Sequence, residues 1–258
     1  MTLLTIDALN VVRRIHEANP TPDSPDKVIG TFRSCMASFR RALSEHRPTH
    51  AVVVFDHGGN TWRHDLYSGY KAHRTPMPAD PKNGLPMLQK DLEESGLSWI
   101  SIEGIEADDA IAALVEKWCV FSQAKVTVLS TDKDFCQLLS DQVCVYDHFK
   151  SSWRDATWVE NNFGVRPDQM GDLLALTGDA VDAIPGVEKV GKKTAASWLK
   201  QFDNLEKLLS RADQIQGKVG VYLRRDSELA RLSKKLVSFK TDMPLGLTWK
   251  MLERRYPE

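Results

Sequence analysis

The sequence predicts an α/β fold with a mostly parallel sheet, because buried strand patterns alternate with helical patterns along the chain. Short apolar runs that lack polar alternation are typical of strands buried on both faces of a parallel sheet. Three such runs (LLTI, AVVVF and VTVLS) and a fourth expected strand occupy residues 3–6, 51–55, 126–130 and 143–146.

Helical patterns separate these strands. Residues 28–43 carry apolar side chains at helical spacing, and residues 108–118 (DDAIAALVEKW) form an amphipathic segment. The second segment has acidic residues in its first turn, where the helix dipole favours negative charge. The alternation therefore extends over the first part of the chain.

After about residue 165 the pattern becomes all-helical with short turns. We therefore expect a core over residues 1–165, a helical region over 166–240 and a segment over 241–258 that returns to the core. Inside the core, residues 76–86 (PMPADPKNGLP) hold four prolines and one glycine. Such a segment resists a regular helix and predicts an exposed loop within a loop region at about 62–95.

The composition is that of an ordinary globular protein of 258 residues and 29.1 kDa, with 42% hydrophobic and 27% charged residues. No apolar run approaches the ~20 residues of a membrane span, and the first ten residues lack the features of a signal peptide. Four scattered cysteines without a Cys-x-x-Cys pair argue against a disulfide framework or a thiolate zinc site. We therefore expect a cytoplasmic protein.

The net charge of −1 hides an uneven distribution. Residues 186–235 contain 12 Lys and Arg against 6 Asp and Glu, so this segment carries +6 and the remainder of the chain −7. A near-neutral total therefore does not exclude a nucleic-acid enzyme with separate basic and acidic surfaces.

Acidic residues follow three of the predicted strands. Asp7 and Asp56 directly end two of them, and Asp132 and Asp134 come just after a third. Ligands of parallel sheets bind outside the carboxyl ends of the strands, which predicts one shared acidic site. Asp also commonly caps the helix that follows. For any single residue capping is an equal alternative, whereas the repetition on three strands favours a shared site.

Two further acidic segments join this set. Glu106, Asp108 and Asp109 open a predicted helix, and Asp179 and Asp182 precede a Pro-Gly turn. Carboxylates packed together repel one another and need a compensating charge. Mg²⁺ prefers oxygen ligands and often contacts only one or two carboxylates directly. Two such ions ~4 Å apart can clamp the attacking and leaving oxygens of a phosphodiester.

The segment 184–195 (IPGVEKVGKKTA) predicts a turn that holds a phosphate. Gly186 and Gly191 flank the turn, and a helix is expected from residue 194 to 199. Free N–H groups at the start of a helix suit a phosphate oxygen, and three lysines add positive charge. This is typical of a helix-hairpin-helix that follows a nucleic-acid backbone without reading bases. The alternative is an ordinary helix–helix connection with solvated lysines.

Taken in order, these segments resemble the 5′-nuclease (flap endonuclease) family, which includes the nuclease domains of bacterial family A DNA polymerases and free-standing enzymes of the Xni type. The resemblance runs from residue 6 to 245 and rests on IDALN, VVFD, WRHDLYSGYKAHR, GIEADDAIA, LSTDKDFCQLLS, LLALTGDAVDAIPGV and KVGKKTAASWL. It implies a PIN-like (Rossmann-like) nuclease core with a helix-three-turn-helix DNA-binding region. No polymerase region follows residue 258, so the free-standing type is expected.

The resemblance also implies roles for individual positions. Asp108 would be the leading candidate for a direct contact with the metal. Lys71 and Arg74 would approach the scissile phosphate and, with Asp108, would be the catalytic residues. Tyr70 would stack on a base. The implied Mg²⁺ acids are Asp7, Asp56, Glu106, Asp108, Asp109, Asp132, Asp134, Asp179 and Asp182. The implied duplex contacts are Lys189, Val190, Gly191, Lys192, Lys193 and Thr194. A K⁺ ion would bind the main-chain carbonyls of Leu176, Thr177, Pro185, Val187 and Val190.

Two departures from the family pattern stand out. Ala183 occupies a position where family members often have Asn, and the proline-rich segment 76–86 is a poor candidate for the helix of the family's arch. The arch region would be residues 62–95.

The leading hypothesis is a monomeric, Mg²⁺-dependent endonuclease, with Mn²⁺ as a substitute, that cuts 5′ flaps of branched DNA in replication and repair. In this mechanism a metal-activated water attacks the phosphodiester. A catalytically weak flap or junction binder is supported by Ala183 and opposed by the intact acids. A phosphohydrolase with an Asp nucleophile lacks its second acid, because the first strand ends in Asp7-Ala8-Leu9. A PIN-type ribonuclease shares the acidic core, but the hairpin and GYKAHR favour DNA.

Overall fold

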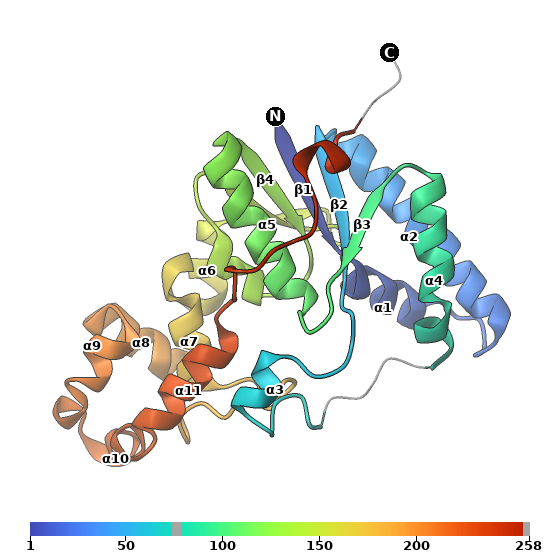
Figure 1. Cartoon of the computed structure of the whole chain (residues 1–258). Helices are drawn as coiled ribbons and strands as arrows, with labels where there is room; N and C mark the ends of the chain where they lie inside the picture. Colours follow the sequence, from blue (N-terminus) through green and yellow to red (C-terminus); the bar gives the residue numbers. More distant parts are fainter. Residues whose placement is uncertain (74–78, 255–258) are drawn as a thin grey trace.

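The computed structural model describes residues 1–73 and 79–254. Its centre is a six-stranded sheet with the order β3-β2-β1-β4-β5-β6 (Figure 1). The first five strands of this order are parallel, and β6 pairs antiparallel with β5. The strands are β1 (Thr2–Asp7), β2 (His50–Phe55), β3 (Ser98–Ser101), β4 (Lys125–Leu129), β5 (Val143–Asp147) and β6 (Ser152–Arg154). The predicted parallel sheet is confirmed, and β3 and β6 are additions to it.

Helices cover both faces of the sheet, as Figure 1 shows. One face is covered by α1 (Ala8–Ala18), α2 (Pro25–His46) and α4 (Ala79–Glu94), which pack against Leu4, Ile6 and Val53. The other face is covered by α5 (Ala107–Ser122), which packs against Leu3 and Val52. Neighbouring residues of one strand point to opposite faces, and both faces are apolar here. The strands therefore carry no polar alternation, which is the pattern that predicted them.

The prediction of a loop at residues 76–86 is wrong for residues 79–86, because α4 begins at Ala79; residues 76–78 lie outside the described part. Pro81 stands in the first turn, where its missing N–H would have no partner in any case. Gly84 lets the helix approach α2 closely, since a Cβ here would stand 2.7 Å from the Phe32 ring. Buried Leu88 and Leu92 fix the helix to the core, so packing outweighs the hydrogen bond that Pro86 removes.

A second hydrophobic core lies in the helical region that follows the sheet, and it includes Val165, Leu199 and Leu223. Its helices are α6 (Ala156–Phe163), α7 (Met170–Thr177), α8 (Lys192–Phe202), α9 (Leu205–Leu209), α10 (Gly217–Arg225) and α11 (Ser227–Val237). Beyond α11 the chain returns to the sheet, where Leu252 is buried and the Arg254 N–H donates to the Thr49 carbonyl at 2.8 Å. Among the described residues no helix has both the length and the apolar character to cross a membrane.

Candidate active site

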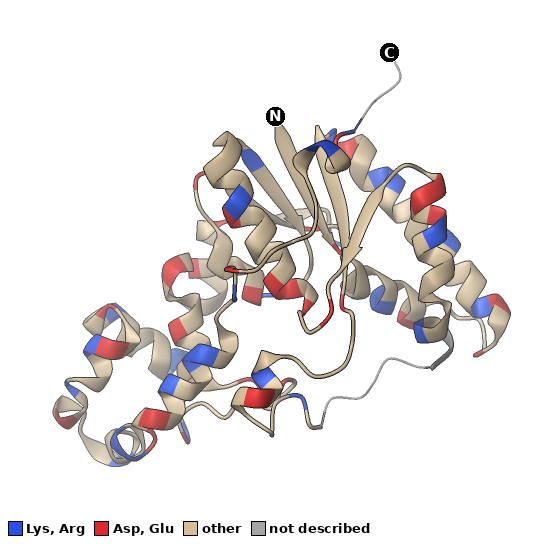
Figure 2. Ribbon diagram, viewed as in Figure 1, with Lys and Arg blue, Asp and Glu red and all other residues tan. Residues whose placement is uncertain are grey.

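The carboxylates that end neighbouring strands meet at one edge of the sheet. Strand β1 lies between β2 and β4, so Asp7, Asp56 and Asp132 come from adjacent strand ends. The pKa of Asp7 is raised to about 7, first by burial and then by the negative charge of Asp56, with a smaller contribution from Asp132. Figure 2 shows further acidic positions at the start of α5, below this edge. The expected convergence is therefore present in the fold.

Two of these acids also cap a helix, so the capping alternative holds for them as well. Asp7 accepts a hydrogen bond from the Asn10 N–H at the start of α1 (3.2 Å) and another from the Ser130 hydroxyl (2.9 Å). Asp56 accepts from the Ala107 N–H at the start of α5 (2.9 Å). The caps fix both carboxylates in orientation, so capping and membership of the acidic group coexist in the same residues.

Asp108 lies in the first turn of α5 and faces this group. Its pKa is raised well above the usual value by loss of contact with water and then by the charges of Asp132, Asp7 and Asp56, in that order. Lys71 opposes the shift. Asp108 is therefore the position at which the charges of all three strand ends act together, and it becomes ionised most readily when a cation is present.

A second acidic group surrounds Asp134, which opens a short 3-10 helix after β4. The pKa of Asp134 is raised to about 7, first by burial and then by the charge of Asp132, with smaller contributions from Asp179 and Asp182, while Lys133 opposes the shift. The buried Oδ1 atom of Asp134 has no hydrogen-bond partner among the described residues and lies 3.6 Å from the Lys133 ammonium. Asp132 contributes to both groups, so the two groups are adjacent.

Asp109 does not join these groups. Consecutive residues of a helix point about 100° apart, and Asp109 is fully buried on another side of α5 from Asp108. Its two oxygens each accept from Arg63 at 2.8 Å, and they also accept from Trp62 Nε1 (2.8 Å) and the Lys240 N–H (3.0 Å). Asp109, one of the nine acids implied for the metal site, therefore has both oxygens already engaged and is not placed to contact a metal ion directly.

Glu106 connects the Arg63 ion pair to Lys71. Its Oε2 accepts from the Lys71 ammonium (3.0 Å), the Tyr70 hydroxyl (3.0 Å) and Arg63 (3.2 Å). The pKa of Glu106 is lowered: burial opposes the shift, but the positive charges of Lys71 and Arg63 outweigh it. Glu106 is thus an ionised residue that positions Lys71.

The first part of the expected arch region, residues 62–73, places Lys71 at the acidic edge but does not place Tyr70 at a surface. The ring of Tyr70 is only 4% exposed, so the implied stacking on a base is wrong for this conformation. Lys71 adopts a left-handed φ of +54°, its N–H donates to the Asp182 carbonyl (2.9 Å), and its ammonium lies 4.0 Å from the Asp182 carboxylate. Arg74 lies outside the described residues.

The predicted hairpin joins α7 to α8, and α8 begins at Lys192, two residues earlier than expected. Lys189, Lys192 and Lys193 are exposed, whereas the Val190 side chain is buried. Any contact of Val190 with a ligand would therefore involve its backbone. Gly191 precedes the helix with open space around it, since a Cβ there would meet no atom within 4 Å.

The carbonyl-bearing residues implied for K⁺ come from both arms of this hairpin. The Val187 N–H donates to the Leu176 carbonyl (2.8 Å), and the Val190 N–H to the Val187 carbonyl (3.2 Å). A Cβ on Gly186 would stand 2.7 Å from the Thr177 carbonyl carbon, which shows how closely the two arms approach. The backbone of residues 176–177 and 185–190 therefore converges.

Over residues 1–73 and 79–254, no three His, Cys, Asp or Glu side chains are placed to enclose a single metal ion. The acids interact through their charges rather than forming a closed cage. This arrangement suits a cation that keeps several of its waters and contacts only one or two carboxylates.

Arg63 and Lys133 are two parts of this site to which the sequence pattern assigned no role. Arg63 is 3% exposed and links α3 (Trp62–Leu66) to α5 and to the Leu236 carbonyl (2.7 Å). Lys133 donates to Asp179 and lies beside Asp134. The only sequence signal was their position, Lys133 between the two acids of TDKD and Arg63 among the basic residues that precede the proline-rich segment.

The fold and this edge define a class: an α/β domain with clustered acids at the carboxyl ends of its strands, joined to a helical domain with a basic hairpin. Two family models match the chain, the 5′-3′ exonuclease N-terminal resolvase-like domain over residues 2–164 and the 5′-3′ exonuclease C-terminal SAM fold over residues 165–258. The chain belongs to the 5′-3′ exonuclease family.

Individual relatives agree with this membership, and a solved structure shares the fold. The chain is 39% identical to the flap endonuclease Xni of Vibrio parahaemolyticus over 95% of this chain and 93% of the relative. It is 38% identical to the flap endonuclease Xni of Aeromonas hydrophila over 99% and 96%. A structure of the bacteriophage T5 flap endonuclease with DNA and metal ions matches with a TM-score of 0.75 and 21% identity, covering 92% of this chain and 89% of that chain.

Proposed function

We propose that this protein is a divalent-metal-dependent endonuclease that cuts 5′ flaps in branched DNA, with Mg²⁺ as its natural ion. The observation that carries the proposal is the adjacency of two acidic groups, around Asp108 and around Asp134, with the ammonium of Lys71 at the same edge. The names of the curated relatives, flap endonuclease Xni, support the reaction and the substrate.

The donor set fits a hard divalent cation. The pKa values of Asp7 and Asp134 are raised to about 7, and the pKa of Asp108 is also raised. A bound cation would therefore stabilise the ionised form of each of these carboxylates. The buried Oδ1 of Asp134 accepts no hydrogen bond from the described residues. One ion would lie among Asp7, Asp56, Asp108 and Asp132, and a second among Asp134, Asp179 and Asp182, each contacting one or two carboxylates directly and the others through bound water. Bound cations would activate water and neutralise charge on the phosphodiester.

The chain's own residues would position the substrate. Lys71 would neutralise a non-bridging oxygen of the scissile phosphate, held in place by Glu106 and by its backbone bond to Asp182. Arg74 is proposed for the same phosphate on the sequence resemblance alone. The ion pair between Asp109 and Arg63 would fix α3 relative to α5 and would thereby position Glu106 and Lys71.

The hairpin would bind duplex DNA away from the cut. The free N–H groups at the start of α8 and the exposed Lys189, Lys192 and Lys193 suit phosphates, which position a duplex without reading its sequence. A K⁺ ion between the carbonyls of Leu176, Thr177, Pro185, Val187 and Val190 and a phosphate would attract both. We further propose that the protein acts as a monomer in the cytoplasm, that Mn²⁺ substitutes for Mg²⁺, and that it serves replication and repair.

The test is a labelled duplex with a 5′ flap, incubated with Mg²⁺, with Mn²⁺ or with EDTA. We expect cutting near the flap junction with either ion, no cutting in EDTA, and loss of cutting in Asp108→Ala. Asp141→Ala is the matched control, because Asp141 is an exposed acid outside both acidic groups. An uncut flap with both ions, or equal cutting by wild type and Asp108→Ala, would refute the proposal.

One observation favours a second candidate, a flap or junction binder with weak catalysis. Ala183 has a left-handed φ of +55°, a conformation that Asn tolerates better than Ala, and it lies next to Asp182. The backbone beside this acid is therefore strained. Tight flap binding without turnover across a range of Mg²⁺ and Mn²⁺ concentrations would select this candidate.

A further inference from the structure

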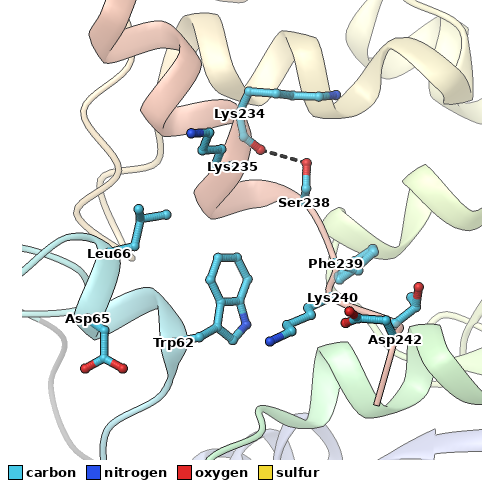
Figure 3. A pocket seen from close by; sticks show the side chains of 10 residues that line it. Trp62, Asp65, Leu66, Lys234, Lys235, Ser238, Phe239, Lys240 and Asp242 are labelled. Carbon is cyan, nitrogen blue, oxygen red and sulfur yellow. Dashed lines mark hydrogen bonds between the residues drawn. The ribbon is translucent and has the colours of Figure 1, made fainter.

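A pocket of about 800 Å³ lies between α3 and the end of α11. Figure 3 shows the side chains that line it. This volume is within the range of sites that bind small organic groups. None of the acids at the strand ends lines this cavity, and Trp62 on its wall donates to the buried Asp109 of α5. The lining residues used below are Trp62, Leu66, Lys234, Lys235, Phe239 and Lys240.

One wall of the cavity is aromatic and rigid. The Trp62 indole is half-buried, its Nε1 is held by Asp109 at 2.8 Å, and the Arg63 guanidinium lies 4.5 Å from the ring centroid. Phe239 stacks on Phe135 with ring centroids 5.7 Å apart. Figure 3 shows the indole projecting between α3 and the segment that follows α11. A ring fixed in this way can stack on a planar group without losing further side-chain freedom.

Two ammonium groups border this aromatic wall. Lys235 and Lys240 are exposed, and neither has an ion-pair partner among the described residues, whereas Lys234 is paired with Asp172 at 2.9 Å. Asp65 and Asp242 also line the cavity, and in Figure 3 the Asp65 carboxylate points away from the two ammonium groups. The cavity thus combines a planar apolar surface with two ammonium groups that have no ion-pair partner in the described part of the chain, and with the carboxylate of Asp242.

We propose that this cavity binds one nucleotide of single-stranded DNA, with its base against Trp62 and its flanking phosphates on Lys235 and Lys240. Aromatic stacking combined with lysines along the backbone is the usual way in which proteins hold single strands without reading sequence. The inference rests on the proposed function only in identifying the strand, which would be the one displaced from the duplex. A free nucleoside monophosphate has the same chemistry, so the experiment separates the two sources.

The test measures binding in EDTA, so that it does not depend on cutting. Fluorescence anisotropy of a labelled oligothymidylate of about twelve nucleotides gives the affinity of the full-length protein and its variants. We expect Trp62→Leu to weaken binding about tenfold, and Trp62→Phe, which keeps an aromatic face, to weaken it less. Thermal unfolding of each variant identifies any that fail to fold. The lysine variants described below test the phosphate contacts independently of Trp62.

The lysines are tested by Lys235→Ala/Lys240→Ala, with Lys117→Ala as the matched control. Lys117 is an exposed lysine of α5 that does not line the cavity. Losing two phosphate contacts to a single strand makes the negative slope of log affinity against log salt shallower by about 1.4. We expect this change in the double variant, no change in Lys117→Ala, and unchanged binding of a blunt duplex by all of them. Asp242→Asn should tighten single-strand binding, because it removes a nearby negative charge.

Three outcomes would overturn the inference. They are an unchanged salt slope in the double lysine variant, equal losses in Lys117→Ala, and binding of thymidine monophosphate at least as tight as that of the oligonucleotide, which would make this a small-molecule site. A failure of the proposed function has a different signature. In that case the oligonucleotide would still bind through Trp62 and the two lysines, while a 5′ flap stayed uncut with Mg²⁺.

Discussion

Replacing Arg63 by Met should destabilise the protein far more than the loss of an exposed ion pair would. Arg63 is 3% exposed, forms two 2.8 Å bonds to the fully buried Asp109, and donates to the carbonyls of Leu236 (2.7 Å) and Ser238 (3.0 Å). Removing one partner of a buried pair costs about 3–5 kcal/mol, because the other charge is left without compensation. Each carbonyl that loses its donor adds about 1 kcal/mol.

The assay is equilibrium unfolding in urea at neutral pH, with Arg231→Met as the matched control. Arg231 is a half-buried arginine that pairs with the exposed Glu206 (3.0 Å) and Glu228 on the helical domain. Exposed pairs contribute about 0–1 kcal/mol, so we expect a loss of about 5–7 kcal/mol for Arg63→Met and less than about 1 kcal/mol for the control. Similar losses in the two variants would refute the assignment of Arg63 and Asp109 as a buried structural pair.

Three further predictions follow from the backbone and from the acids. Ala183→Gly should raise the free energy of unfolding by about 0.5–1 kcal/mol in urea unfolding, because Ala183 has a φ of +55°; a loss of stability would contradict the strain. Gly186→Ala should destabilise by at least about 2 kcal/mol, since a Cβ would stand 2.3 Å from the Gly178 nitrogen at a φ of +66°, and Gly191→Ala, with open space, should change little. The pKa values of Asp7 and Asp134 are raised to about 7, so the folded, cation-free protein binds more protons than the unfolded chain between about pH 4 and 7. The free energy of unfolding should therefore fall as pH rises through that window, by at most about 1.4 kcal/mol per pH unit for each group. Mg²⁺ should raise the melting temperature more at pH 8 than at pH 6, because cation binding displaces these protons. An equal effect of Mg²⁺ at both pH values would refute this expectation.

The sheet and the meeting of its strand ends were predictable from the sequence, because a strand buried on both faces has an uninterrupted apolar pattern. The two short strands β3 and β6 lack such a pattern: Ser98–Ser101 is only partly buried throughout, and β6 has three residues. Residues 79–86 were mispredicted because local proline content was weighed without the packing of Gly84 against Phe32. That contact lies between residues far apart in the chain, which periodicity does not reveal.

Within the candidate site, the sequence indicated which acids gather but not how each is oriented. Asp108 and Asp109 are adjacent in EADD, yet one faces the strand ends and the other an arginine forty-six residues earlier. The burial of Tyr70 likewise depends on Glu106, which its hydroxyl contacts from another element. Side-chain direction depends on the helix phase and on distant partners, so a motif identifies candidates whose roles only the fold separates.

The central claim is that the acids at the carboxyl edge of the sheet hold the catalytic cations, and Asp108→Asn compared with its neighbour Asp109→Asn tests it most directly. One set of samples gives both the rate of flap cutting as Mg²⁺ is titrated and the free energy of unfolding in EDTA. We expect Asp108→Asn to lower cutting about a hundredfold or more and to leave stability unchanged or higher, because it relieves repulsion. We expect Asp109→Asn to lower stability by about 3 kcal/mol. Undiminished cutting by Asp108→Asn at every Mg²⁺ concentration would show that these acids do not hold the catalytic cations.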